Sequence, residues 1–351
     1  MSNELRIALA TPLDEDLCQM VERLEPRVQL IRDHSLLPPQ RHAGDHYGEV
    51  GWRRPAHKQS EFEQMLKSAD AIYGIPDLST EFLGEVVREN RRLRWVQAMA
   101  AGAAAQVRGA GFEAPDVAHV AFTTSAGVHA KPLAEFAAFG VLAGAKQLPT
   151  LLANQRERSW SPRRILGQLA EQRVLVVGLG SIGAETARIL TAFGMTVVGA
   201  NRTEREVPGI DRTFGLDDLV RAADGCSALV VALPGHPSTD RLVDRQVLDA
   251  LNPSATVVNV GRGTVIDEPA LVDAAKSGQV GFVTLDVTAV EPLPPESPLW
   301  DMPNVLLSPH TAALSTLEDE RIARLVADNA GRLLDGKPLR NLIPLDQITN
   351  A

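Results

Sequence analysis

The chain has 351 residues, of which 44% are hydrophobic and 23% are charged. At roughly 150 residues per domain this length suggests two domains, and the composition is that of a folded globular protein. Lys and Arg number 35 against 44 Asp and Glu, which gives a net charge of -9. An acidic chain repels nucleic-acid phosphates and anionic membrane surfaces, so we expect neither as a partner.

The two cysteines, Cys18 and Cys226, lie far apart in the sequence and form no C-x-x-C motif. They predict neither a disulfide framework nor a thiolate metal site. No apolar run approaches the ~20 residues of a membrane span, and the apolar stretch near the start is too short for a signal peptide. We therefore expect a cytoplasmic protein without a bound metal.

The first part of the chain alternates short β-rich runs with helical patterns, which indicates βα units around a parallel sheet. Thr80 to Asn90 has the apolar spacing of an amphipathic helix, with Thr80 as its candidate N-cap. Residues 35 to 54 contain Pro, Gly and His without either period and predict a long loop. The expected strands are Arg6 to Ala10, Val28 to Ile31, Ala69 to Ile75 and Leu93 to Met99.

A second βα series begins near Gly127, with a predicted helix from Lys131 to about Gln147. Near-continuous hydrophobic runs separated by helical patterns follow, and these are typical of a doubly wound parallel sheet with both faces covered. After His310 comes a helical stretch that ends at Gly336. The predicted strands are Val174 to Val177, Thr196 to Gly199, Ala228 to Ala232, Thr256 to Val260, Phe282 to Leu285 and Val305 to Leu307.

The first strand of this series runs into Gly178-Leu-Gly180-Ser181-Ile182-Gly183, the pattern G-x-G-x-x-G, and then into a helical pattern. Gly178 permits a tight turn, Gly180 lets the backbone approach a pyrophosphate, and Gly183 lets helix and strand pack closely. The helix N-terminus attracts phosphate. Because strand, turn and helix occur together, they predict a dinucleotide site rather than a mere Gly-rich turn.

The next strand ends in Asn201-Arg202-Thr203, about twenty positions past the glycines, where the adenosine ribose binds. An acidic residue there would bind the free 2′-hydroxyl of NAD, whereas a guanidinium suits the 2′-phosphate of NADP. We therefore expect NADP as the cofactor, with NAD as the alternative. In that alternative Arg202 is a solvated residue and Glu204 binds the ribose in a shifted register.

Three further residues follow neighbouring strands at the carboxyl edge of the predicted sheet, where the ligands of such sheets bind. Arg262 and His310 each come directly after a strand, and Glu291 lies in a Pro-rich loop between them. A guanidinium can bind a carboxylate and stabilise a developing oxyanion, while an imidazolium can donate a proton. The trio suits hydride transfer to a 2-oxo acid, with Glu291 orienting the His310 ring. Taken singly, a satisfied core histidine and a capping arginine are the simpler interpretations.

With these motifs the chain resembles the D-isomer-specific 2-hydroxyacid dehydrogenases, a family that includes glyoxylate/hydroxypyruvate reductases. The resemblance rests on the glycine motif, Asn259-Val-Gly-Arg-Gly263, Leu285-Asp-Val, Glu291-Pro-Leu-Pro and Ser308-Pro-His-Thr-Ala-Ala313. It implies that Arg262 and His310 bind substrate and that His310 is the acid/base. It also implies a nicotinamide and adenosine pocket that is lined by Leu233, Pro234, Val260, Gly261 and Asp286.

The resemblance further implies a discontinuous flavodoxin-like substrate domain of residues 1–124 and 314–351, and a Rossmann dinucleotide-binding domain of residues 125–313. Where the family commonly has a Ser and a Gly-x-Asp, this chain has Ala98-Met-Ala-Ala101-Gly102. The backbone N–H groups of Ala101 and Gly102 are then expected to hold the substrate carboxylate. A homodimer formed through the nucleotide domain is implied by the resemblance only.

Two other functions remain open at this point: a dinucleotide-sensing corepressor on the same fold, and an NAD-dependent phosphoglycerate-type dehydrogenase. The intact trio favours an enzyme that transfers hydride between NADP(H) and a small 2-oxo or D-2-hydroxy acid. We expect His129 to be structural. The residues His42, His46, Asp33, His34 and Asp45 are of types that bind metals, but a solvated loop is favoured.

Overall fold

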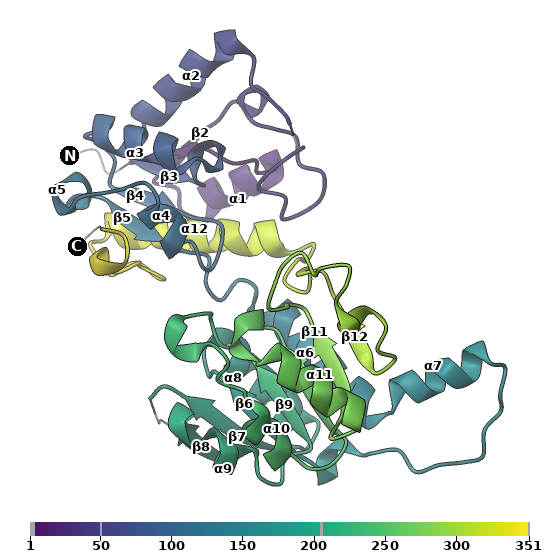
Figure 1. The fold of residues 1–351 in the computed structure, drawn as a ribbon. Coiled ribbons are helices and arrows are strands. Elements are labelled where there is room, and N and C mark those ends of the chain that lie inside the picture. Colours follow the sequence, from purple (N-terminus) through teal and green to yellow (C-terminus); the bar gives the residue numbers. More distant parts are fainter. Residues whose placement is uncertain (1–3, 50, 204–205, 350–351) are drawn as a thin grey trace. The chain divides into compact units, whose positions relative to one another are not determined.

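A computed structural model describes residues 4–49, 51–203 and 206–349 of the chain. The chain divides into two compact units, unit 1 with Met1–His129 and Leu314–Ala351, and unit 2 with Ala130–Ala313. Each unit contains a parallel β-sheet with helices packed on it (Figure 1). The predicted α/β architecture, with two parallel sheets, is thus confirmed.

The first boundary between the units lies after His129 and not after residue 124, because the intervening segment packs within unit 1. The Ser125 hydroxyl donates a hydrogen bond to the carbonyl oxygen of Ala98 and accepts one from the Gln97 amide. Val128 is buried in the core of unit 1. The second boundary lies between Ala313 and Leu314.

The sheet of unit 1 has the strand order β2-β1-β3-β4-β5, which is the flavodoxin-like order. The C-terminal helix α12 (Glu318–Leu334) packs against α1 (Glu15–Leu24), so the end of the chain completes this unit. The strands are β1 (Leu5–Leu9), β2 (Val28–Ile31), β3 (Ala71–Tyr73), β4 (Trp95–Gln97) and β5 (Ala121–Thr123), and the other helices are α2 (Ala56–Lys67), α3 (Thr80–Glu89), α4 (Ala104–Arg108) and α5 (Ala114–Val117).

The helix α3 shows how local sequence produces these elements. Its N-cap is Ser79 and not the predicted Thr80, since the Ser79 hydroxyl accepts a hydrogen bond from the backbone N–H of Phe82. Leu83, Val86 and Val87 then form one apolar face, which is buried against the sheet side of unit 1.

The sheet of unit 2 has the order β12-β11-β10-β9-β6-β7-β8. In the opposite direction the order is β8-β7-β6-β9-β10-β11-β12. If β6 is numbered 1, this is the doubly wound order 3-2-1-4-5-6 with β12 as one further strand. The order reverses between β6 and β9. The strands are β6 (Arg173–Val177), β7 (Thr196–Asn201), β8 (Arg212–Gly215), β9 (Ala228–Val231), β10 (Ala255–Asn259), β11 (Val280–Leu285) and β12 (Val305–Leu307).

Helices cover both faces of this second sheet, as the continuous hydrophobic strands require. One buried cluster joins α6 (Ala130–Ala145) and α8 (Ser181–Ala192) to the sheet. The other cluster contains residues of α9 (Leu219–Ala223), α10 (Arg245–Ala250) and α11 (Glu268–Ser277).

The helix α7 (Leu148–Arg156) differs from these helices because none of its residues is buried. In Figure 1, α7 and the segment after it extend away from the sheet of unit 2. Within the described ranges, no single helix is long and apolar enough to cross a membrane, and α6 and α7 reach that length only as a pair bent by 67°.

Candidate functional site

The glycine turn between β6 and α8 has the shape that a dinucleotide requires. Gly178 has a φ of +96°, and a Cβ at Gly183 would collide with the carbonyl oxygen of Gly178. A Cβ at Gly180, by contrast, would meet no atom within 4 Å, so the backbone there is open to a ligand. Among the described residues, no acceptor lies against the backbone N–H groups of Ser181 and Ile182. These free donors at a helix N-terminus fit a pyrophosphate.

The ribose edge of the predicted site lies at the end of β7. Asn201 is the last residue of this strand, and its side-chain oxygen lies 3.5 Å from the backbone nitrogen of Leu179 in the glycine turn. Arg202 and Thr203 are exposed, and Arg202 has no acidic partner within the described part of the chain. Glu204, the alternative ribose ligand, lies outside the described residues.

The loops after β9 and β10 close the other side of the reversal point. Leu233 and Val260 are buried, and a Cβ at Gly261 would collide with the carbonyl oxygen of Leu233. The two loops therefore touch through their backbones. Leu233, Pro234, Val260 and Gly261 thus gather at the carboxyl edge of the sheet beside the glycine turn, where we expect them to line the cofactor pocket.

His310 and Glu291 form the closest pair among the predicted catalytic residues. The Nδ1 atom of His310 lies 2.7 Å from Oε2 of Glu291, whose Oε1 accepts a hydrogen bond from the backbone N–H of Thr288. Both side chains are partly exposed. Nε2 of His310 has no partner within residues 4–49, 51–203 and 206–349. A carboxylate-oriented imidazole with one free nitrogen can exchange a proton with a ligand.

A buried carboxylate holds the backbone around His310. His310 has a φ of +53°, in the left-handed region, and its backbone N–H donates to the carbonyl oxygen of Asp286. Oδ1 of Asp286 accepts hydrogen bonds from the Ser308 hydroxyl at 2.7 Å and from the backbone N–H groups of Thr311 and Ala312 at 2.9 Å each. From the sequence, Asp286 was expected to line the cofactor pocket, and this positioning role was not predicted. The signal that could have indicated it is an acidic residue at the end of the strand that precedes the Ser308-Pro-His strand end.

Arg262 follows β10, next to β11 in the sheet, and its side chain is exposed. Its guanidinium donates one hydrogen bond, to the carbonyl oxygen of Gly261, and has no carboxylate partner in the part of the chain that the structure describes. Asn259 is buried, its side-chain amide donates to the carbonyl oxygen of Arg262, and its side-chain oxygen accepts from the N–H of Gly261. These two hydrogen bonds fix the turn that carries Arg262. An exposed, unpaired guanidinium on a fixed turn is suited to bind an anion.

Ala101 and Gly102 lie in unit 1, in the turn that follows β4, and both are exposed. Neither backbone N–H has a hydrogen-bond acceptor within the described ranges. The trio of Arg262, Glu291 and His310 lies in unit 2, so the role of Ala101 and Gly102 in carboxylate binding stays a prediction.

The loop of residues 35–54 corrects one prediction. His42 is exposed, but Asp45 and His46 are only 1% and 7% exposed, so the interpretation as a solvated loop is wrong for these two residues. Nε2 of His46 lies 3.3 Å from Oε1 of Glu318, and His129 contacts the same oxygen at 3.0 Å. His129 is thus held in a structural contact, as expected.

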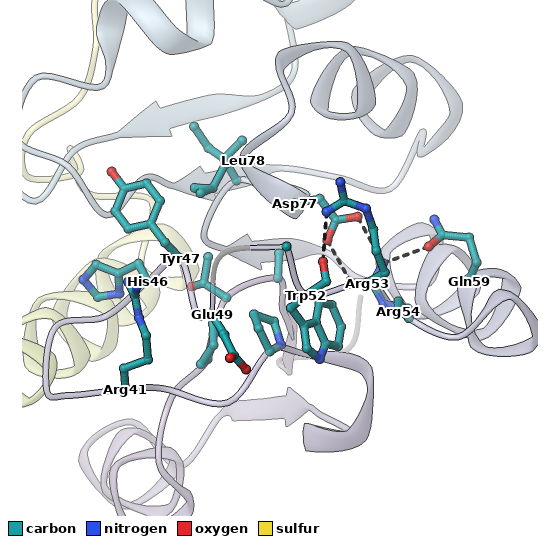
Figure 2. Close-up of a pocket in the computed structure, with 17 residues that line it drawn as sticks. Arg41, His46, Tyr47, Glu49, Trp52, Arg53, Arg54, Gln59, Asp77 and Leu78 are labelled. Atoms are coloured by element: carbon teal, nitrogen blue, oxygen red, sulfur yellow. Dashed lines mark hydrogen bonds and ion pairs between the residues drawn. The ribbon is translucent and has the colours of Figure 1, made fainter.

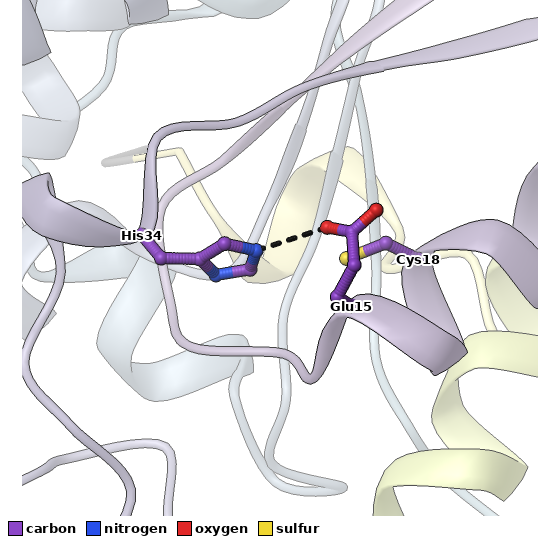
Figure 3. Close-up of side chains that lie close together, drawn as sticks. All are labelled: Glu15, Cys18 and His34. Atoms are coloured by element: carbon purple, nitrogen blue, oxygen red, sulfur yellow. Dashed lines mark hydrogen bonds and ion pairs between the residues drawn. The ribbon is translucent and has the colours of Figure 1, made fainter.

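A second side-chain group has the residue types of a metal site, namely Glu15, Cys18 and His34 (Figure 3). Glu15 lies 3.1 Å from His34, but it also forms a two-bond ion pair with Arg32. Burial raises the pKa of the Cys18 thiol to about 12, which disfavours the thiolate that a metal requires. These residues therefore fit an ion-pair network better than a metal site.

Comparisons with known proteins point to one family. The model of the D-isomer specific 2-hydroxyacid dehydrogenase NAD binding domain matches residues 139–312. Glyoxylate reductase from Aeropyrum pernix is 30% identical over 295 residues, which cover 79% of this chain and 83% of that protein. Glyoxylate/hydroxypyruvate reductase A from Yersinia enterocolitica is 31% identical over 201 residues, covering 56% of this chain and 64% of that protein.

A solved structure extends the likeness to both units. It is the D-isomer specific 2-hydroxyacid dehydrogenase from Xanthobacter autotrophicus Py2 in complex with NADPH and MES. It is 28% identical to this chain, covers 98% of this chain and 99% of its own, and superposes with a TM-score of 0.75.

Proposed function

Since this chain belongs to the D-isomer specific 2-hydroxyacid dehydrogenases, which are NAD(P)-dependent oxidoreductases, we propose that it reduces a small 2-oxo acid with NADPH. The observation that carries the proposal is the 2.7 Å contact between His310 and Glu291, at the same sheet edge as the unpaired Arg262. Relatives named for glyoxylate and hydroxypyruvate support substrates of this size.

The residues of the site divide the chemistry among them. When bound, the nicotinamide supplies a hydride to the carbonyl carbon of the 2-oxo acid. Arg262 binds the substrate carboxylate and stabilises the negative charge that grows on the carbonyl oxygen. His310 donates a proton from Nε2 to that oxygen, which yields the 2-hydroxy acid. Glu291 accepts from Nδ1 and thereby orients the ring and stabilises its protonated form.

The choice of NADPH rests on the end of β7. Arg202 is exposed beside Asn201 and Thr203, and no described acid competes for its guanidinium. A free guanidinium favours the additional 2′-phosphate through charge-assisted hydrogen bonds. The related Xanthobacter structure, which contains NADPH, supports the same preference.

The proposal includes a homodimer formed through unit 2. In and after α7, large apolar side chains are exposed, with Trp160 and Ile165 almost fully so. Large apolar side chains that are exposed in one segment favour a protein contact, and a second copy is the partner that the family resemblance implies. The cytoplasm is the proposed compartment, because Cys18 and Cys226 are both free and buried.

Steady-state oxidation of NADPH by the full chain tests the proposal, with glyoxylate, hydroxypyruvate and pyruvate as substrates. We expect turnover with at least one of them, and His310→Gln should lower kcat roughly 100-fold or more while NADPH affinity stays unchanged. A variant with the wild-type kcat would remove His310 from the mechanism. Turnover of 3-phosphoglycerate with NAD alone would favour the phosphoglycerate-type alternative.

A further inference from the structure

The Glu291 carboxylate that contacts His310 lies in the loop of residues 286–291 after β11, and not in a helix or strand. The side chains of Glu291 and His310 are 37% and 46% exposed, so burial does little to hold them. The 2.7 Å contact between them therefore depends on the backbone of the loop. A residue that holds this backbone would act on the proposed proton transfer without touching the substrate.

Thr288 is the residue of this loop that contacts Glu291. Its backbone N–H donates to Oε1 of Glu291 at 3.2 Å, which leaves Oε2 for the His310 ring. The Thr288 hydroxyl also donates to the carbonyl oxygen of Val290 at 2.8 Å, within the same turn. The orientation of the backbone at Thr288 thus determines where the carboxylate of Glu291 lies.

Gly263 limits the movement of this backbone in one direction. A Cβ at Gly263 would collide with the carbonyl group of Thr288, so the turn that carries Arg262 touches the loop directly. A steric contact opposes approach and does not oppose separation. A further interaction must therefore hold the loop against the turn.

Glu268 supplies that interaction. It is the first residue of α11, and its Oε2 accepts a hydrogen bond from the backbone N–H of Ala289 at 2.9 Å. Glu268 is not needed as the helix cap, because Asp267 accepts from the N–H of Ala270. A hydrogen bond to a carboxylate is also stronger than one between neutral groups. Of two consecutive N–H groups, that of Thr288 thus binds Glu291 and the next one is held by Glu268.

We propose that Glu268 is a positioning residue, which holds the backbone at Thr288 and Ala289 and so keeps the Glu291 carboxylate aligned with Nδ1 of His310. The inference rests on the proposed function, in which His310 donates its proton from Nε2. A ring whose Nδ1–H is bonded to Glu291 has Nε2 free for the substrate. When the loop moves, the neutral ring can carry its proton on either nitrogen, and fewer rings are aligned for transfer.

Substitutions of Glu268 separate the reach of its acceptor oxygen from its charge. Glu268→Gln keeps an oxygen at the same distance along the side chain without the charge, whereas Glu268→Asp keeps the charge on a shorter side chain. Glu268→Asp and Glu268→Ala should lower kcat for reduction of a 2-oxo acid roughly 10-fold, with KM within about twofold of the wild type. Glu268→Gln should recover most of the wild-type kcat.

The tautomer of His310 is a readout that needs no turnover. Nitrogen NMR of the full chain with isotopically labelled histidine, recorded without substrate or cofactor at a pH at which the ring is neutral, shows which ring nitrogen carries the proton. The signal of His310 is the one that is lost in His310→Gln. The wild type and Glu268→Gln should carry the proton on Nδ1. Glu268→Asp and Glu268→Ala should share it between Nδ1 and Nε2.

Asp273→Ala is the matched control, because it removes a carboxylate of the same helix that pairs with the exposed Arg245. It should leave kcat and the tautomer unchanged. An unchanged tautomer or the wild-type kcat in both Glu268→Asp and Glu268→Ala, or a Glu268→Gln variant that behaves like them, would overturn the proposal. A wild type that reduces no 2-oxo acid would refute the proposed function instead, and the tautomer would still show whether Glu268 aligns the pair.

Discussion

The two side chains that are proposed to act on the substrate are held in place by buried polar neighbours. Asp286 holds the turn that presents His310, and Asn259 holds the turn that presents Arg262. Both supporting side chains are almost fully buried, and their hydrogen bonds offset the cost of burying polar groups. The reactive groups can therefore remain exposed and unpaired at their working ends while their backbones stay fixed.

Cofactor preference is the prediction that belongs to a single residue. Arg202→Ala should weaken NADPH binding roughly 10- to 150-fold and leave NADH almost unchanged, because only the 2′-phosphate loses a charge-assisted partner. Asn201→Asp should repel that phosphate and favour NADH. Titration of each cofactor by fluorescence checks both variants. If the unmodified protein bound NADH as tightly as NADPH, Glu204 or another acid would be the ribose ligand instead.

The strands and helices could be predicted wherever their burial produces a clear hydrophobic pattern in the sequence. The hydrophobic runs around Val28, Val174 and Val257 became strands, and the G-x-G-x-x-G turn joins strand to helix as its spacing predicts. The prediction missed β5, which has three residues, and β8, an edge strand in which Phe214 is the buried residue. Neither segment, Ala-Phe-Thr in β5 or Arg-Thr-Phe-Gly in β8, has the continuous apolar run that marks a buried strand.

The burial of His46 could not be predicted from local sequence either. Its partner Glu318 lies 272 positions along the chain, at the start of α12. Only the return of the C-terminal helix to unit 1 brings these two side chains together. The same holds for Asp286, whose contact with Ser308 depends on the pairing of β11 with β12.

The contact between the 35–54 loop and α12 carries a pH prediction. Burial opposes the ionisation of Glu318, but hydrogen bonds from His129 and His46 outweigh it and lower the pKa of this carboxyl to about 2. Because the pKa of Glu318 is lower in the folded protein than its ordinary value of 4.5, the ionised carboxylate stabilises the folded protein at pH values above 4.5. That stabilisation is lost as the pH falls from 4.5 toward 2. Glu318→Gln should therefore reduce the acid-dependent fall in Tm across this window.

Thermal unfolding at a series of pH values measures the effect. Glu320→Gln serves as the control, because Glu320 lies on the same helix and pairs with Arg324 at a more exposed position. The control should keep the wild-type pH dependence. A pH dependence of Glu318→Gln that matches the wild type would show that the histidine contacts contribute nothing to acid stability.

At the scale of the whole molecule, both units place exposed polar or cationic groups at the carboxyl edge of a parallel sheet. Unit 2 carries Arg262 and His310 there, and in unit 1 Arg53 lines a cavity of about 600 Å³ at the ends of β1 and β3 (Figure 2). The fold class was predictable because it depends on the alternation of strands and helices, which the hydrophobic pattern reveals. Neither α7 nor its exposure was predicted, because the sequence pattern was expected to end the preceding helix near Gln147.

We expect the protein to assemble as a homodimer. The protein should have twice the monomer mass of 37.8 kDa in light scattering, because the apolar side chains in and after α7 need a covering partner. Trp160→Ser combined with Ile165→Ser should shift the mass toward the monomer. Leu345→Ser, at an exposed apolar residue of unit 1, should leave the mass unchanged. A monomeric wild-type protein would refute the homodimer.

Transfer of deuterium tests the central claim most directly. The full chain is incubated with hydroxypyruvate and NADPH that carries deuterium at the transferable position of the nicotinamide, and the product is examined by NMR and chiral chromatography. The account predicts D-glycerate with one deuterium at C2, and a rate that falls roughly 100-fold or more in His310→Gln. Oxidation of NADPH without deuterium at C2, formation of the L-isomer, or the absence of turnover with any 2-oxo acid would contradict it.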